Sequence, residues 1–143
     1  MKHWVATAAS IFSTHTIRVL LAMALLVISY LAFTPLDTPV VTEFNDKLSH
    51  IVAFFALAFL VDFSWPRSTW NPLKYLPLFG YGLFIEVVQA FIPHRIFSTW
   101  DLVADILGLL IYPLLLPLLL RIPLIQALRY GASRNRTHKI NRL

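Results

Sequence analysis

The chain has 143 residues, of which 58% are hydrophobic and 13% are charged. An average soluble domain has roughly 25% charged residues. A chain this short cannot build a core large enough to hide so much apolar surface from water, so the composition predicts one domain that faces lipid. The chain contains no cysteine, which excludes disulfides and thiolate metal sites.

The formal net charge is +5, with 12 Lys and Arg against 7 Asp and Glu. Six of the twelve basic residues lie from Arg121 onward, beside apolar segments. This placement is typical of a membrane-surface flank, so we expect no nucleic-acid partner.

Four apolar segments are each long enough to cross a bilayer, which takes roughly 20 residues. In chain order they cover about residues 17–33, 48–65, 73–92 and 100–120. Each ends where a proline stands beside a polar or charged residue, a common place for a helix to stop. The first segment lacks small residues spaced for signal-peptide cleavage after it, so we expect an uncleaved span.

The short connections between these segments predict that consecutive spans are antiparallel neighbours. The expected fold is therefore an all-α, integral membrane four-helix bundle that forms a single domain over residues 1–143. The tail, residues 121–143, is basic and polar. Its first part, residues 122–130, is predicted to form a short helix at the membrane surface, and the remainder to be flexible.

The distribution of Lys and Arg predicts the topology. Only Lys47 and Arg95 lie on one side of the predicted spans. The other ten lie on the opposite side: Lys2, Arg18, Arg67, Lys74, Arg121, Arg129, Arg134, Arg136, Lys139 and Arg142. Because basic residues concentrate on the cytoplasmic side, both termini are expected in the cytoplasm.

Polar residues gather where the second, third and fourth spans approach the outer side. Three pairs have helical spacing and share one helix face each: Asp46 with His50, Glu86 with Gln89, and Asp101 with Asp105. Ionisable residues at membrane depth usually face the bundle interior or water. We therefore expect the three pairs to converge on one polar cavity that opens to the outer side.

The residue types suggest two kinds of role in this cavity. The candidate catalytic residues, as acid–base or orienting groups, are His50, Glu86, Asp101 and Asp105. The candidate substrate-binding residues are Asp46, Lys47, Gln89, Arg95 and Ser98, with the two cations suited to an anionic head group.

Each candidate also has a structural alternative. His50 is in position to bind Asp46, and Glu86 to pair with Lys47, Arg95 or Gln89. Asp101 fits the first turn of a helix with Ser98 as its N-cap. On the inner side Asp62 is expected to pair with Arg67. Gly80, Gly82 and Gly108 are expected at close contacts between helices.

A metal site would need hard oxygen ligands and an imidazole, which His50, Glu86, Asp101 and Asp105 together supply. The sequence lacks a compact motif such as H-E-x-x-H. We therefore expect no cofactor and no resident metal, with a divalent ion as the minor alternative.

These residues also carry a family resemblance, over about residues 46–110. Asp46-Lys47-Leu48-Ser49-His50, then Glu86-Val87-Val88-Gln89 with Pro93 and Arg95, then Asp101 to Gly108, resemble the motifs of the VanZ-like family. That family consists of small bacterial membrane proteins, and its founding member is associated with low-level teicoplanin resistance. The resemblance implies a multi-pass protein of the bacterial cytoplasmic (inner) membrane and cell envelope.

Three functions are compatible with these observations. The first is binding of, or catalysis on, a membrane lipid or lipid-linked envelope precursor at the outer leaflet, with a link to glycopeptide resistance. The second is a non-catalytic accessory protein whose polar cluster is structural and which binds a protein partner. The third, a small transporter or proton pathway, is disfavoured because Asp62 is the only acidic relay group in the inner half.

Overall fold

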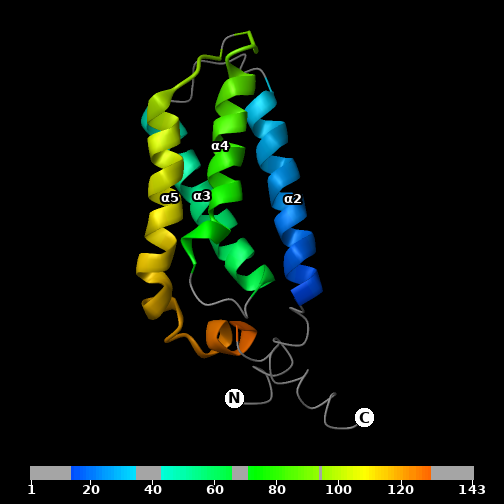
Figure 1. The fold of residues 1–143 in the computed structure, drawn as a ribbon, viewed down its shortest axis with the longest axis vertical. Coiled ribbons are helices and arrows are strands. Elements are labelled where there is room, and N and C mark those ends of the chain that lie inside the picture. The colour runs from blue at the N-terminus through cyan, green and yellow to red at the C-terminus, as the bar shows by residue number, and fades with distance from the viewer. Residues whose placement is uncertain (1–13, 35–42, 66–70, 94, 130–143) are drawn as a thin grey trace.

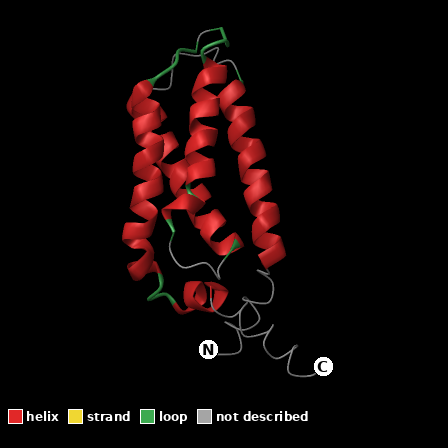
Figure 2. Cartoon of the chain, in the orientation of Figure 1, coloured by secondary structure: helices red, strands yellow, loops and turns green. Residues whose placement is uncertain are grey.

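The computed structural model describes residues 14–34, 43–65, 71–93 and 95–129, and this part of the chain is helical without a β-strand (Figure 2). Its elements are α2 (Thr14–Phe33), α3 (Glu43–Ser64), the 3-10 turn η1 (Pro72–Lys74), α4 (Leu76–Gln89) and α5 (Thr99–Leu119). Residues 123–129 form a further short helix, where the sequence predicts one.

The four longer helices run side by side and alternate in direction, as Figure 1 shows. The most extensive helix contact joins α3 and α5, followed by α2 and α3. Because α3 and α5 both begin at the upper end of the bundle in Figure 1, they are parallel neighbours. The start of α2 and the 123–129 helix both lie at the lower end, as an even number of crossings requires. The predicted all-α bundle is confirmed.

Within the part of the chain that the structure describes, three helices are long and apolar enough to cross a membrane: Thr14–Phe33, Asn45–Ser64 and Thr99–Leu119. The third expected span, 73–92, is shorter than the sequence suggests. Its α-helix has 14 residues, or about 21 Å at 1.5 Å per residue. Proline explains both ends, since Pro77 lies in the first turn of α4 and Pro93 disfavours helical geometry in the residue before it.

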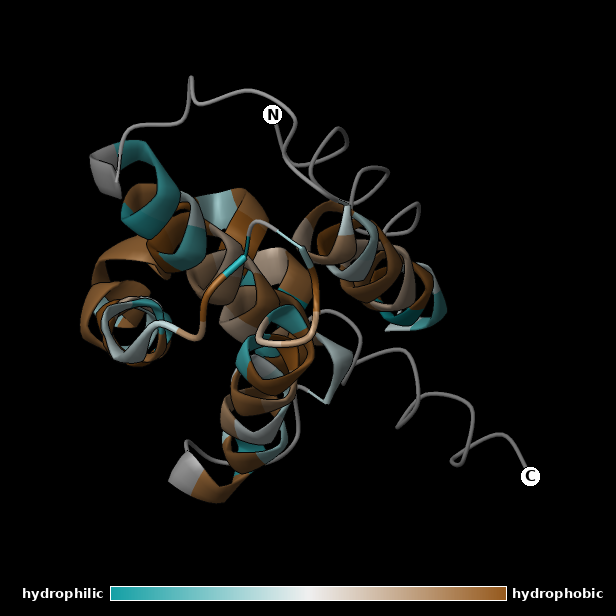
Figure 3. Cartoon of the chain, turned by 90° about the horizontal axis from the view of Figure 1, so that it is seen from above, coloured by the Kyte–Doolittle hydropathy of each residue, from teal (hydrophilic) through white to brown (hydrophobic). Residues whose placement is uncertain are grey.

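The helices bury a small core and leave a wide apolar surface. Phe54, Leu57, Ala58 and Tyr112 are almost completely buried at the centre of the bundle. Large apolar side chains such as Leu114 are exposed on every helix, and Figure 3 shows hydrophobic colouring on all four. An exposed apolar surface of this extent fits a bundle that is surrounded by lipid.

Of the three glycines within the described residues, two lie where helices approach closely. A Cβ atom at Gly108 would lie 2.5 Å from the Ile51 carbonyl oxygen and 3.0 Å from the Phe55 nitrogen, both in the backbone of α3. A Cβ at Gly82 would collide with the Asp105 carboxylate. The same expectation is wrong for Gly80, where no atom lies within 4 Å because this face of α4 is open.

Asp62 is the centre of a buried ionic network at the lower end. Its carboxylate accepts hydrogen bonds from Lys74 Nζ at 3.1 Å and Tyr112 Oη at 2.7 Å, and Arg129 Nη1 lies 3.0 Å away. The expected partner Arg67 lies outside the described residues. Sequence proximity suggested Arg67, whereas helix packing brings in Lys74 and Arg129, and the network ties the 123–129 helix to the bundle.

Candidate functional site

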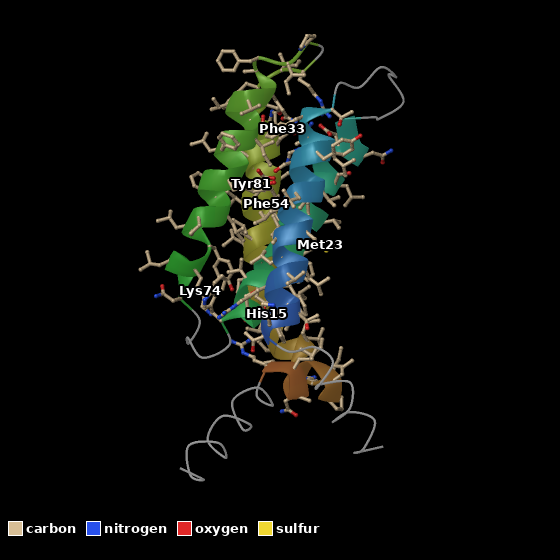
Figure 4. All side chains as sticks on the ribbon, turned by 90° about the vertical axis from the view of Figure 1, so that its right-hand side faces the viewer. His15, Met23, Phe33, Phe54, Lys74 and Tyr81 are labelled. Atoms are coloured by element: carbon tan, nitrogen blue, oxygen red, sulfur yellow. The ribbon has the colours of Figure 1, made fainter. Side chains whose placement is uncertain are left out.

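The nine candidate residues all lie at the end of the bundle where α2 and α4 finish and α3 and α5 begin. Figure 4 marks this end by Phe33 and the opposite end by Lys74. Asp46 and His50 lie at the start of α3, Asp101 and Asp105 at the start of α5, and Glu86 and Gln89 at the end of α4. The three helical pairs are therefore brought to the same end of the bundle, as predicted, although not all of their members line one cavity.

His50 is held by Asp105. Its Nδ1 atom lies 2.8 Å from Asp105 Oδ1, and the Asp105 side chain is 1% exposed. The parallel start of α3 and α5, with their close approach at Gly108, brings the two side chains to the same level. This arrangement replaces the expected bond to Asp46. A hydrogen bond at Nδ1 fixes the ring and leaves Nε2 for another partner.

Glu86 is completely buried, so its side chain does not face lipid. Its Oε2 atom accepts a hydrogen bond from the Ser98 backbone N–H at 2.8 Å. Ser98 in turn caps α5, because its Oγ accepts the Asp101 backbone N–H at 3.3 Å. The N-cap prediction is confirmed, and the ionised form of Glu86 would be stabilised by the positive end of the α5 dipole. Its other oxygen, Oε1, is buried without a hydrogen-bond partner.

Gln89 and Arg95 both reach the last carbonyls of α2. Gln89 Nε2 donates to the Ala32 carbonyl at 3.1 Å. Arg95 Nη2 donates to the Leu31 and Thr34 carbonyls, each at 3.4 Å. The final carbonyls of a helix lack partners within the helix, so these two side chains complete the end of α2. Arg95 Nε is buried without a hydrogen-bond partner.

A cavity of about 360 Å³ opens beside this cluster, between α2, α3 and α4. Its volume falls within the roughly 300–1,000 Å³ of typical ligand sites. One part of the lining is apolar and the other part is polar. The apolar lining consists of Ile28, Leu31, Ala32, Ala53, Phe54 and Ile85, and the polar lining of Asp46, Ser49, His50, Gln89 and Arg95.

The wall that α2 supplies is absent from the sequence-based site. Residues 28, 31 and 32 have helical spacing, but all three are apolar, so no polar residue among them marks the face that lines a cavity. Ser49 also lines the cavity, although its Oγ donates to the Asn45 carbonyl within α3.

The candidate residues thus form two layers. Asp46, His50, Gln89 and Arg95 line the cavity. Behind them, Glu86, Asp101 and Asp105 are buried. Lys47 Nζ lies 4.0 Å from Asp101 Oδ1. With four carboxylates and two cations, Lys47 and Arg95, the cluster has an excess of negative charge when its carboxylates are ionised.

Three residues of the cluster have the geometry of a metal site. One ligand atom each from Asp46, His50 and Asp101 lies within 4.8 Å of the other two. This set differs from the combination suggested by sequence. The sequence suggested Glu86 and Asp105 as ligands, but Glu86 binds the Ser98 N–H and Asp105 binds His50 Nδ1. Asp46 replaces them in the ligand set.

Comparison with known proteins gives one family. The family model described as VanZ/LLP1 matches residues 5–120. The chain is also 39% identical, over 92 residues, to a protein of Schizosaccharomyces pombe described as "Uncharacterized protein C11E3.10". The match covers 60% of this chain and 54% of the relative, so the chain spans about half the length of that protein. No solved structure matches the chain.

The family match covers most of the chain and includes all nine candidate residues. The resemblance seen in the motifs is thus confirmed by an independent comparison over a longer segment. This protein belongs to the VanZ/LLP1 family.

Proposed function

We propose that the protein binds one amphiphilic or lipid-linked molecule in the cavity and acts on its polar head group by hydrolysis or transfer. The observation that carries this proposal is the lining of the cavity. Apolar residues such as Leu31 and Ile85 form one part, and His50 and Arg95 form another. A lipid has the same division into an apolar chain and a polar head.

The polar residues have separate tasks in this proposal. Arg95, whose buried Nε has no hydrogen-bond partner, receives a phosphate or carboxylate of the head group. His50, fixed by Asp105, keeps its remaining nitrogen available at the polar edge of the cavity, for the head group itself or for an ion that binds the head group. Glu86 and Ser98 hold the start of α5, and thereby Asp105, in place.

The location follows from the Lys and Arg count. With both termini in the cytoplasm, the cavity opens at the outer leaflet. The VanZ-like motifs support the inner membrane of a bacterium as the membrane concerned. The relative from Schizosaccharomyces pombe favours a phospholipid over a wall precursor, because yeasts make no peptidoglycan. In a bacterium, an altered outer leaflet would connect this activity with glycopeptide susceptibility.

Lipid retention by the purified protein tests the proposal. Native mass spectrometry is expected to show one bound lipid on the wild type. Ala53→Phe, which fills the cavity, is expected to lose it. Leu114→Phe, at a side chain that is 77% exposed on the outer surface, is the matched control and is expected to keep it. Equal retention by both variants would contradict the proposed site.

A second function is supported by a different observation. Glu86, Gln89 and Arg95 all bind backbone groups at helix ends, which is also what a purely structural cluster would do. In that case the protein is a non-catalytic accessory protein that presents a surface to a partner. His50→Ala separates the two functions: the accessory protein keeps its physiological activity, whereas the lipid-modifying protein loses it at unchanged membrane abundance.

A further inference from the structure

We infer that Asp46, His50 and Asp101 bind one divalent metal ion at the polar edge of the cavity. This inference deepens the proposed function and rests on it for the task of the ion, but the binding itself is argued from the geometry alone. It departs from the sequence-based expectation of no metal, which relied on the absence of a compact motif.

The ligand set is assembled by two helices. Asp46 and His50 stand four residues apart on one face of α3, and Asp101 comes from the first turn of the parallel helix α5. Their ligand atoms lie within 4.8 Å of one another, close enough for small side-chain movements to bring all three to one ion. Two carboxylates and an imidazole suit zinc or manganese. Three protein ligands also leave coordination positions open for water or substrate.

Asp101 gives independent support for a bound cation. Its side chain is 9% exposed, and its Oδ1 atom is buried without a hydrogen-bond partner. Lys47 Nζ, at 4.0 Å, is too distant to donate a hydrogen bond. A buried carboxylate oxygen without a donor is costly, and a metal ion in direct contact removes that cost.

Asp105 prepares His50 as a ligand. Metal-binding histidines usually donate their second ring N–H to a carboxylate or carbonyl, which fixes the tautomer. Asp105 Oδ1 lies 2.8 Å from His50 Nδ1, which favours the tautomer with its proton on Nδ1 and leaves the lone pair of Nε2 for the ion. The buried position of Asp105 is explained by this supporting role.

The charge of the cluster also favours a bound cation. Asp46, Glu86, Asp101 and Asp105 carry four negative charges when ionised, and Lys47 and Arg95 carry two positive ones. A divalent ion makes the sum zero, which favours the cluster in a membrane, where unpaired charge is costly. The ion would then bind the anionic oxygens of the head group together with Arg95.

Manganese binding to the purified full chain, stripped with chelator, tests the inference. About one Mn²⁺ per chain is expected by titration, with a rise in Tm. The spin-echo spectrum of the bound ion should show a directly coordinated imidazole nitrogen, and His50→Gln should remove that signal. Asp46→Asn, at a partly exposed position, should weaken Mn²⁺ binding at least tenfold without unfolding the bundle.

Glu86→Gln is the matched control, because it removes a carboxylate of the cluster that is outside the ligand set. It is expected to keep the bound ion and the nitrogen signal. The inference is overturned if the wild type binds no Mn²⁺ or Zn²⁺ at millimolar concentration. It is also overturned if Asp46→Asn binds as tightly as the wild type, or if Glu86→Gln loses the ion as completely as Asp46→Asn does.

The lipid measurement separates this outcome from the proposed function. A chain that retains lipid but binds no metal overturns the metal site and leaves the lipid cavity standing. A chain that binds metal in the expected pattern but retains no lipid overturns the lipid cavity and leaves the metal site standing.

Discussion

The close approach of α3 and α5 at Gly108 makes a quantitative prediction for the variant Gly108→Ala. The added methyl group would lie 2.5 Å from the Ile51 carbonyl oxygen and 3.0 Å from the Phe55 nitrogen. Both atoms belong to the backbone of α3, so no side-chain rotation relieves the contact, and the two helices must separate.

The size of the effect follows from two opposing terms. Overpacking a tight contact costs about 1–3 kcal/mol, and rigid backbone atoms place this site near the upper value. Replacing a helical glycine by alanine contributes roughly 0.5–1 kcal/mol in the opposite direction. We therefore expect Gly108→Ala to lower the free energy of unfolding by about 2 kcal/mol.

Gly80→Ala is the matched control, because no atom lies within 4 Å of a Cβ at this position. It has the favourable term alone and should stabilise the bundle by about 0.5–1 kcal/mol. Reversible unfolding of both variants in mixed detergent micelles measures the difference. If Gly108→Ala is as stable as Gly80→Ala, then α3 and α5 do not approach as closely at Gly108 as described. The explanation of how His50 is positioned against Asp105 would then be refuted.

Three further predictions concern the lower end, the start of α5 and the topology. Asp62→Ala removes the carboxylate that Lys74 and Arg129 both contact. It should lower the free energy of unfolding by about 3–5 kcal/mol and make the 123–129 helix sensitive to protease. An unchanged Tm and an unchanged cleavage pattern would refute the network. Glu86→Ala leaves the N–H of Ser98 without its acceptor and should lower the free energy of unfolding by about 1–3 kcal/mol. Glu86→Gln keeps an acceptor oxygen and should lower Tm less. An equal loss of Tm in both variants would exclude the hydrogen bond as the cause. A C-terminal reporter fusion should be active only in the cytoplasm, and periplasmic activity would reverse the assigned orientation.

The sequence predicts the helices well because lipid imposes a simple requirement on length and composition. The segments 17–33, 48–65 and 100–120 correspond to α2, α3 and α5 within a few residues. The segment 73–92 was overestimated, because hydropathy does not register how Pro77 and Pro93 limit a helix. Hydropathy alone detects an apolar segment, and backbone chemistry decides how much of it is helical.

The composition of the polar cluster was also predictable, but its pairing was not. Ionisable residues at helical spacing identified the cluster. The partner of His50 depends on the register between α3 and α5, which Gly108 sets through a contact that is local in space and distant in sequence. Similarly, Asp62 pairs with Lys74 and Arg129, which no spacing rule connects to it.

The cavity wall formed by α2 is held differently from the rest of the bundle. Only Ile17 and Leu21 of this helix are buried, and apolar contact contributes little to helix association in lipid. Hydrogen bonds attach α2 to the other helices instead. They are Arg18 with the Ser64 carbonyl, Ser29 with Tyr81, Tyr81 with the Leu25 carbonyl, and Gln89 and Arg95 with the end of α2.

Each such bond contributes on average about 0.6 kcal/mol in a membrane protein, so the attachment of α2 is distributed and modest. Two of its members, Gln89 and Arg95, also line the cavity. A head group that binds Arg95 therefore competes for the same guanidinium that secures the end of α2. Because of this shared use, the shape of the cavity and the binding of its ligand are coupled through one side chain.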